Sequence, residues 1–286
     1  MFAFFGSSHL SVIILEILKS CGYIPKLIVT VEDKPSGRKM LLTPPETKVW
    51  AEKENLPVLQ LQSLKKPESL ESIKSFSPLG YDLFIVASYG KIIPDEILNL
   101  PRRKTINFHP SLLPKLRGPS PIKSAILSEN ETGVTLIRLD SEVDHGPIIL
   151  QEKVEIEDWP PYARDLENIL SKVGGEMLCQ IIPDWLLGEV QETEQDHSKA
   201  TFCQKIRKSD GEINLEDNPE KNLRKIRAFH EWPRAFFYFN MPDRTKKRII
   251  IKKARIVDSK LFLEKVVPEG RKEMSFEDFL KGLKES

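Results

Sequence analysis

The segment Asp82-Leu-Phe-Ile-Val-Ala87 is the clearest buried strand in the sequence, and it runs directly into Ser88-Tyr-Gly-Lys-Ile-Ile-Pro94. Five consecutive apolar residues followed by a glycine and a proline are typical of a central strand that is covered on both faces. The run Phe2–Phe5 stops at a glycine in the same way, and Thr105–His109 stops at a proline. Amphipathic or polar stretches separate these strands. The pattern therefore predicts an α/β domain with a doubly wound, mostly parallel sheet.

Further along the chain the pattern changes from this alternation to a second, smaller domain. A helix-like stretch runs from Tyr162 to Leu187 and contains one proline. The segment after it is polar and aperiodic, as linkers often are. The last part of the chain holds only short strand-like runs, which favour a shortened, OB-like β domain: Ala235–Phe239, Arg248–Lys253 and Lys260–Val267. We therefore expect a catalytic domain at 1–188, a linker at 189–205 and a C-terminal domain at 206–286.

The charge is unevenly distributed although the overall composition is ordinary. Of the 286 residues, 40% are hydrophobic and 30% are charged, which is usual for a folded domain and excludes a disordered chain. The formal net charge is only +1, but residues 207–286 contain 20 Lys and Arg against 14 Asp and Glu, a net of +6, and the rest carries −5. A basic tail on an acidic body suggests a polyanionic partner for the tail.

Several kinds of site are not expected. The three cysteines, Cys21, Cys179 and Cys203, form no CxxC pair, so the sequence predicts neither a disulfide nor a zinc site and fits a reducing, cytoplasmic compartment. No apolar run approaches the ~20 residues that a membrane-spanning helix needs, so no membrane partner is expected. Neither GxGxxG nor GxxxxGK[ST] occurs, which argues against a dinucleotide or P-loop nucleotide. We expect no metal, because the chain offers no ligand set for one.

The segment from residue 106 to 150 holds the residues best suited to chemistry. Asn107 and His109 are two residues apart at the end of a strand, so both side chains lie on the same face. Strand ends of an open parallel sheet are where ligands bind. An amide beside an imidazole can hold an oxyanion or move a proton, and a carboxylate such as Asp144 can orient the imidazole. Each residue alone also fits a structural role, but together they indicate a catalytic site.

The motifs in this segment resemble those of the folate-dependent formyltransferases. They are Asn107-Phe-His-Pro-Ser-Leu-Leu-Pro114, Arg117-Gly118, Glu131-Thr-Gly-Val-Thr135 and Val143-Asp-His-Gly146. Stretches similar to the same family run nearly from end to end: Lys34–Arg38, Pro44–Lys48, Val86–Pro94, Lys208–Ile213, Ile226–Pro233 and Pro268–Leu280. Within the family, the sequence most resembles the members that act on methionyl-tRNA.

The resemblance implies an enzyme that moves the formyl group of 10-formyltetrahydrofolate to a primary amine. In that family, residues at the positions of Asn107 and His109 stabilise the oxyanion of the tetrahedral intermediate, and the residue at Asp144 holds the histidine and can accept a proton. The residues implied to contact the folate co-substrate are Tyr89, Gly90, Ser111, Leu112, Leu113 and Pro114.

The resemblance also implies that methionyl initiator tRNA is the acceptor, that the enzyme supports translation initiation and that it acts as a monomer. Residues 32–45 are predicted to form a loop, and the family uses a basic loop at this place on tRNA. In the C-terminal domain a run of cations follows Asp243 with no acid before Asp258, and such a run can track a phosphate backbone. The residues expected to bind tRNA are Arg38, Lys39, Lys246, Lys247, Arg248, Lys252 and Lys253.

A sugar-nucleotide N-formyltransferase acting on a dTDP- or UDP-linked amino sugar is the main alternative. Enzymes of that kind share the three catalytic residues and vary at the C-terminus. Only 53 residues follow Pro233, which is short for a complete five-stranded OB fold and keeps this alternative open. Donor hydrolysis, an RNA-binding module without catalysis, and a metal hydrolase built on His109, Asp144 and His145 fit less well. The complete set of catalytic residues argues against an RNA-binding module without catalysis. The adjacency of Asp144 and His145 argues against a metal hydrolase, because neighbouring residues cannot easily bind the same ion.

Overall fold

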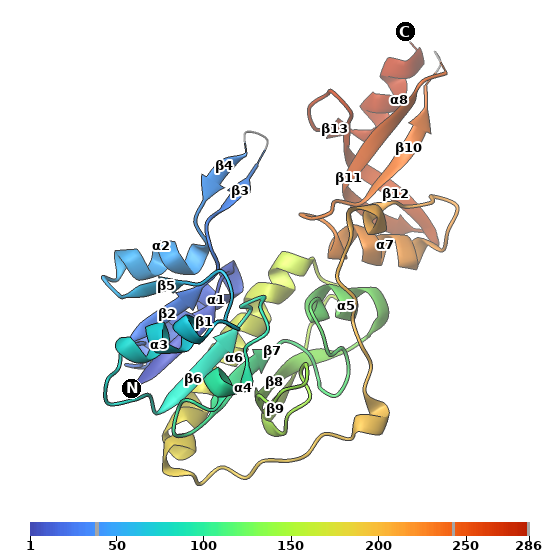
Figure 1. Cartoon of the computed structure of the whole chain (residues 1–286). Helices are drawn as coiled ribbons and strands as arrows, with labels where there is room; N and C mark the ends of the chain where they lie inside the picture. Colours follow the sequence, from blue (N-terminus) through green and yellow to red (C-terminus); the bar gives the residue numbers. More distant parts are fainter. Residues whose placement is uncertain (38–39, 242–243, 285–286) are drawn as a thin grey trace. The chain divides into compact units, whose positions relative to one another are not determined.

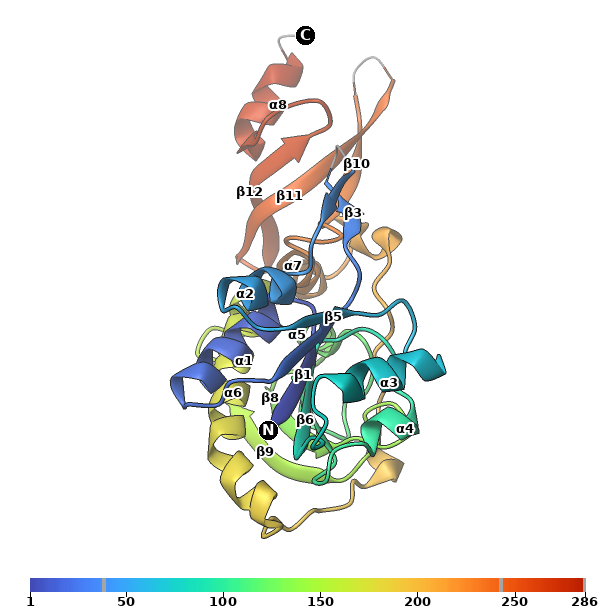
Figure 2. The same ribbon diagram turned by 60° about the vertical axis from the view of Figure 1, so that its left-hand side comes forward.

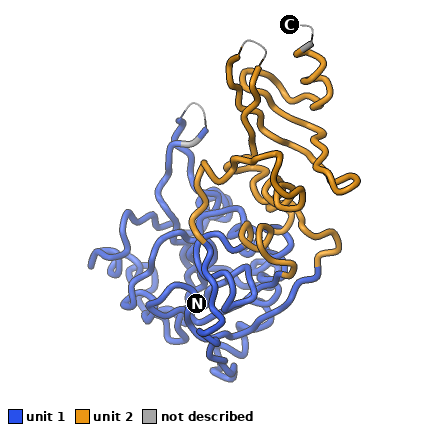
Figure 3. The backbone as a smooth tube through the Cα atoms, turned by 90° about the vertical axis from the view of Figure 1, so that its right-hand side faces the viewer, with its two compact units in different colours: residues 1–121, 132–155, 167–203 blue, residues 122–131, 156–166, 204–286 orange. Residues whose placement is uncertain are grey.

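A computed structural model describes residues 1–37, 40–241 and 244–284, and the chain divides into two compact units (Figure 3). The first unit comprises residues 1–121, 132–155 and 167–203, and the second comprises residues 122–131, 156–166 and 204–286. The boundaries therefore differ from the simple division along the sequence. Two short segments from the middle of the chain belong with the C-terminal residues, and most of the expected linker belongs to the first unit.

The first unit is built on a sheet of seven strands in the order β5-β2-β1-β6-β7-β8-β9 (Figure 1). These strands are β1 (Phe2–Gly6), β2 (Leu27–Thr30), β5 (Val58–Gln60), β6 (Leu83–Ala87), β7 (Thr105–His109), β8 (Thr132–Arg138) and β9 (Ile148–Val154). From β5 to β7 all neighbours are parallel, whereas β8 is antiparallel to β7, and β9 to β8. The predicted mostly parallel sheet is confirmed.

Helices cover both faces of this sheet, as a doubly wound fold requires. They are α1 (His9–Ser20), α2 (Glu46–Lys53), α3 (Pro67–Ser75), α4 (Asp95–Leu98) and α6 (Ala163–Leu187). Figure 2 shows α1, α2 and α6 on one side of the sheet and α3 and α4 on the other. Ala3 and Phe5 of β1 belong to a buried cluster that includes Ile73 of α3, so Phe2 and Phe4, one residue out of phase, face the opposite helices. This burial on both faces explains the uninterrupted apolar runs of the sequence.

Two adjacent glycines let α6 lie close to its neighbours. A Cβ atom on Gly174 would come within 2.1 Å of the Phe108 ring, and one on Gly175 would come within 2.8 Å of Ile17 in α1. The Phe108 ring therefore faces α6, and the residues on either side of it in β7 must point to the opposite face. The helix continues through Pro183, where the sequence pattern is interrupted. No helix within the described residues is both long and apolar enough to cross a membrane.

Cys21 and Cys179 form a disulfide, so the prediction that no disulfide occurs was wrong. Cys21 follows the last turn of α1, and Cys179 lies in α6, 158 residues later. Two cysteines so far apart in the sequence form no local pattern from which a disulfide could be predicted. The close approach of α6 to α1 at Gly175 brings the two Cα atoms to 6.2 Å, within the range of a disulfide. Cys203 is buried and lies outside this bond.

The segment from residue 32 to 45 was predicted to be a loop, but two short strands within it form a hairpin. β3 (Lys34–Ser36) pairs antiparallel with β4 (Leu41–Thr43), with Lys34 opposite Thr43. The chain leaves β3 at Gly37, whose φ of +72° suits a tight turn. Strands of three residues that contain proline and lysine show no alternating pattern, which is why the sequence did not reveal them.

The second unit is built on a four-stranded antiparallel sheet in the order β10-β11-β12-β13. The strands are β10 (Phe236–Asn240), β11 (Lys246–Val257), β12 (Lys260–Pro268) and β13 (Met274–Ser275), and the helices include α5 (Pro121–Ser128), α7 (Pro219–Ala228) and α8 (Phe276–Lys284). Phe237 and Phe239 of β10 pack edge-on against Phe276 and Phe279 of α8. The predicted small β domain is confirmed, and the described residues form one strand fewer than a five-stranded OB fold.

Reduction of the Cys21–Cys179 disulfide is expected to lower thermal stability. The bond closes a loop of 158 residues, for which chain entropy gives about 5 kcal/mol. This corresponds to roughly 10 °C in melting temperature for a domain of this size. Thermal unfolding with and without reductant measures the effect, and the Cys21→Ser variant should melt at the lower temperature under both conditions. An unchanged melting temperature after mass spectrometry has shown the bond to be open would contradict the prediction.

Candidate active site

The carboxyl end of β7 places Asn107 and His109 side by side in the middle of the sheet. Asn107 stands opposite Val86 of β6, and His109 stands opposite Thr135 of β8. Both side chains are buried and lie on the face of β7 opposite Phe108. The juxtaposition predicted from their spacing is therefore present, and it is fixed on both sides by neighbouring strands.

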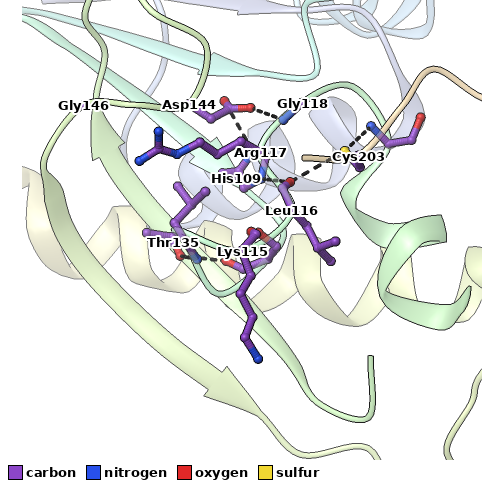
Figure 4. A network of polar contacts seen from close by, with 12 residues as sticks. His109, Lys115, Leu116, Arg117, Gly118, Thr135, Asp144, Gly146 and Cys203 are labelled. Atoms are coloured by element: carbon purple, nitrogen blue, oxygen red, sulfur yellow. Dashed lines mark hydrogen bonds and ion pairs between the residues drawn. The ribbon is translucent and has the colours of Figure 1, made fainter. Parts of the chain in front are cut away.

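His109 faces an oxygen acceptor at each ring nitrogen (Figure 4). Its Nε2 lies 3.0 Å from the carbonyl oxygen of Leu116, and its Nδ1 lies 3.4 Å from Oδ1 of Asp144. Because a carbonyl oxygen can only accept, Nε2 is the donor in the first contact. An imidazole with N–H groups on both nitrogens would satisfy both acceptors. The predicted partnership of His109 with Asp144 is thus present in the structure.

Asp144 is held as an ionised carboxylate by the groups around it. Its Oδ2 accepts a hydrogen bond of 2.8 Å from the backbone N–H of Gly118. Burial by itself would raise the pKa of the Asp144 carboxyl. The charge and hydrogen bond of His109, with smaller effects of the Gly118 N–H and the Arg117 charge, outweigh burial and hold that pKa below its usual value. Among the described residues, no three His, Cys, Asp or Glu side chains are grouped to hold a metal ion.

Two glycines allow the loops around Asp144 to approach so closely. A Cβ atom on Gly146 would lie 1.9 Å from the carbonyl oxygen of Arg138, and one on Gly118 would lie 2.6 Å from that of Cys203. Gly118 also has a φ of +117°, which a residue with a side chain rarely adopts. Asp144 itself has a φ of +51°, a left-handed conformation that aspartate tolerates better than most residues. The position of the carboxylate therefore depends on tight backbone packing.

The turn that follows His109 is fixed by one hydroxyl group. Thr135 Oγ1 donates to the carbonyl oxygen of Ser111 at 2.7 Å, and it accepts from the Leu113 N–H at 3.1 Å and from Gln151 Nε2 at 2.8 Å. One donated and two accepted bonds use the full capacity of a hydroxyl. The turn is thereby joined to β8 and β9 beside Asn107 and His109.

The six residues predicted to contact folate differ in their surroundings. Ser111 and Leu113 are buried, whereas Leu112 and Pro114 are half-buried beside them. Tyr89 is only 2% exposed, and its ring packs edge-on against Phe5 in the core, where burial raises the pKa of its hydroxyl to about 12. Gly90, with a φ of +77°, is exposed next to it. The turn thus adjoins the catalytic residues while the tyrosine ring belongs to the core, and the folate contacts stay a prediction.

The cations predicted to bind tRNA differ in their surroundings. Arg38 and Lys39 lie outside the described residues. The other five lie on β11, where Lys246 stacks over the Tyr238 ring at 5.1 Å and Arg248 over the Phe236 ring at 3.8 Å. Lys253 instead pairs with Glu264 of β12 at 3.2 Å. The remaining two of the five are Lys247 and Lys252.

Sequence reasoning missed three residues of the site. Arg117, recognised only as part of a motif, is buried and donates to Gln195 and His197. Gln195 in turn binds the backbone around Asp144. Both Gln195 and His197 were assigned to the linker, and nothing in the local sequence marks them, because their partners lie about 50 to 80 residues away.

Comparison with known protein families agrees with this geometry. Residues 2–182 match the sequence model of a family described as "Formyl transferase", and residues 205–261 match that of "Formyl transferase, C-terminal domain". The chain is 40% identical over 239 residues to the methionyl-tRNA formyltransferase of Chloroflexus aggregans, covering 82% of this chain and 75% of that one. It is 39% identical over 233 residues to that of Thermotoga maritima, covering 81% and 73%.

Solved structures with a similar fold include enzymes with different acceptors. A sugar N-formyltransferase from a Shewanella species superposes with a TM-score of 0.65 at 18% identity, covering 90% of this chain and 98% of that one. The methionyl-tRNA formyltransferase from Clostridium thermocellum superposes with a TM-score of 0.55 at 18% identity, covering 85% and 97%. At such identities the superpositions show the shared fold and leave the acceptor open.

Proposed function

We propose that this chain, which belongs to the formyl transferase family, transfers the formyl group of 10-formyltetrahydrofolate to the α-amine of methionyl-tRNA. The observation that carries the proposal is the 40% identity with a methionyl-tRNA formyltransferase over 82% of the chain. Sugar N-formyltransferases of known structure share the fold at 17% to 21% identity and a methionyl-tRNA formyltransferase of known structure at 18%, so the superpositions do not choose between the acceptors. We also propose that the enzyme works as a monomer and supports translation initiation in the cytoplasm, where charged tRNA is present; the cysteines do not support this compartment, because Cys21 and Cys179 form a disulfide.

The reaction begins when the neutral α-amine attacks the formyl carbon of the donor. A free α-amino group has a pKa of about 8, so a useful fraction is neutral near pH 7. The new C–N bond forms as the carbonyl π electrons move to oxygen, which becomes an oxyanion. On one face of β7, the Asn107 amide donates a hydrogen bond to this oxyanion, and the positive charge of the His109 imidazolium, whose two N–H groups face Leu116 and Asp144, stabilises it electrostatically. Their burial strengthens the interaction, because water competes less for it.

The tetrahedral intermediate then releases the formylated amine. The bond between the formyl carbon and N10 of the folate breaks, the attacking nitrogen loses a proton, and the folate nitrogen gains one. Asp144, which stays ionised because its pKa is lowered, holds His109 in place and accepts the proton directly or through water. Protons are therefore neither consumed nor produced overall, and tetrahydrofolate is the second product.

The variants Asn107→Ala, His109→Ala and Asp144→Ala are each expected to lower turnover by orders of magnitude without unfolding the chain. Loss of one oxyanion donor typically costs ~3 kcal/mol of barrier. Single-turnover formylation measures the effect, and thermal melting checks the fold. Asp144→Asn serves as a matched control for shape, because it keeps an acceptor for the Gly118 N–H and loses only the charge. Near wild-type turnover in His109→Ala would sink this mechanism.

The acceptor is tested directly by supplying 10-formyltetrahydrofolate with charged methionyl initiator tRNA or with a panel of amino-sugar nucleotides. Formylation of the tRNA alone is expected, in a gel-filtration fraction that matches the 32.8 kDa monomer. Uncharged initiator tRNA is the matched control, because it offers the same phosphates without the amine. Formylation of a sugar nucleotide alone would replace the proposed acceptor by the sugar and leave the chemistry at His109 unchanged.

For tRNA contact in the second unit, we propose the surface formed by the exposed residues Tyr238 and Lys246, beside which Arg248 and the buried ring of Phe236 lie on the same face. Tyr238 stands opposite Arg248 in the register of β10 and β11, and the four residues alternate along the two strands, so they share one face. Each cation stacks on an aromatic ring. Cations interleaved with rings suit a nucleic acid, because cations attract phosphates and ring faces accept bases.

The variant Lys246→Ala is expected to weaken tRNA binding roughly threefold to tenfold. The slope of log binding constant against log salt concentration should fall by about one, as expected for the loss of one phosphate contact. Lys253→Ala is the matched control, because it removes an exposed lysine of the same strand that already pairs with Glu264. Equilibrium binding across a salt series compares the two. Equal losses for both variants would show that general charge, and not this surface, governs the contact.

A further inference from the structure

The loop that carries the catalytic carboxylate, residues 144–146, is held by a glutamine from a distant segment. Gln195 Nε2 donates to the carbonyl oxygen of Asp144 at 2.9 Å and to that of Gly146 at 2.7 Å. The side chain is 5% exposed and therefore works without competition from bulk water. One amide group thus bridges both ends of the loop.

The other end of the same amide fixes its orientation. Gln195 Oε1 accepts from Nε of Arg117 at 3.2 Å and from Nη2 at 2.6 Å. Arginine can only donate and a carbonyl can only accept, so the amide cannot be turned over without losing every bond. Glutamine is suited to this place because its side chain combines two donors and an acceptor at one tip. Glutamate lacks the donors, and lysine lacks the acceptor.

A neighbouring histidine holds the loop from a second direction. His197 Nδ1 accepts from Arg117 Nη2 at 2.8 Å. Its ring stacks on that of His145, the central residue of the loop, with centroids 4.1 Å apart and an interplanar angle of 2°. His145 Nδ1 in turn lies 2.8 Å from Oδ2 of Asp140. The segment 195–197 therefore contacts all three residues of the loop.

We propose that Gln195 is a positioning residue for formyl transfer: by holding the Asp144 and Gly146 carbonyls while anchored on Arg117, it sets the distance of the Asp144 carboxylate from His109. The inference rests on the proposed function for its assay. It follows from the geometry of the loop: Asp144 has a left-handed backbone, which is unfavourable for a residue with a side chain, so the loop needs restraints, and the two hydrogen bonds from Gln195 act directly on its backbone. A displacement of about 1 Å at such a site can cost 10²-fold in rate.

The variant Gln195→Glu tests this role, because it keeps the size of the side chain and an acceptor for Arg117 while it replaces the two donors by a charged oxygen that the Asp144 and Gly146 carbonyls cannot bind. We expect kcat to fall about 10-fold to 100-fold while KM for the folate donor stays within about twofold. Gln191→Glu is the matched control, since it makes the same substitution at an exposed position of the same segment and should leave both constants unchanged. If Gln195→Glu does not fold, Gln195→Met removes the donors without adding charge.

A double-mutant cycle separates positioning from a merely structural role. In the Asp144→Asn background, Gln195→Glu is expected to cost little further activity, because the carboxylate that it positions is already absent. If Gln195→Glu lowers kcat by the same factor in both backgrounds, the proposal is overturned. A wild-type kcat in Gln195→Glu would also overturn it.

Hydrogen exchange provides a readout that needs no acceptor. The backbone amides around residues 144–146 should exchange at least about tenfold faster in Gln195→Glu, or in Gln195→Met, than in wild type or Gln191→Glu. Unchanged exchange would overturn the proposal. A wild-type protein that leaves methionyl-tRNA unformylated while the variant exchanges faster would overturn the proposed acceptor and support the role of Gln195.

Discussion

The buried pair of the Asp144 carboxylate and the His109 imidazole is the interaction on which the rest of the site depends. Taking a charged carboxylate out of water costs several kcal/mol, and good geometry with hydrogen bonds must offset that cost. The Gly118 N–H supplies one such bond, and Gly146 allows the loop to come close enough. The surrounding glycines and amides are therefore best understood as the means by which one carboxylate is kept ionised at a fixed place.

The sheet provides the other half of this arrangement. Packing of the Phe108 ring against Gly174 turns one face of β7 towards α6, so the alternation of the strand directs Asn107 and His109 to the opposite face. The turn after His109 is then held by the Thr135 hydroxyl, with all three of its hydrogen bonds made. A rigid core contact on one side of a strand thus positions polar groups on the other, which is how a preorganised site avoids reorganisation during the reaction.

The residues that we propose for formyl transfer and those that we propose for acceptor contact on β11 lie in different compact units of the chain. All residues that we assign to formyl transfer lie in the first unit, whereas the stacked cations on β11 lie in the second. A sugar N-formyltransferase and a methionyl-tRNA formyltransferase of known structure both superpose on most of the chain, so the fold alone does not decide the acceptor. Under our proposal the acceptor is distinguished by the surface around Lys246 and Tyr238, where charge and aromatic area are combined.

The amino-acid sequence alone determined the α/β class, the small β domain, and the grouping of Asn107 and His109, because apolar runs and the period of two are local properties that survive without the fold. The motif that contains Asp144 was equally visible in the sequence. Only the tertiary structure decided that Cys21 forms a disulfide with Cys179 and that β3 and β4 form a hairpin. It also decided that Gln195 and His197, in a segment predicted to be a linker, contact the loop of residues 144–146. These contacts join residues far apart or strands too short for a pattern, and they arise from packing, which no local sequence signal encodes.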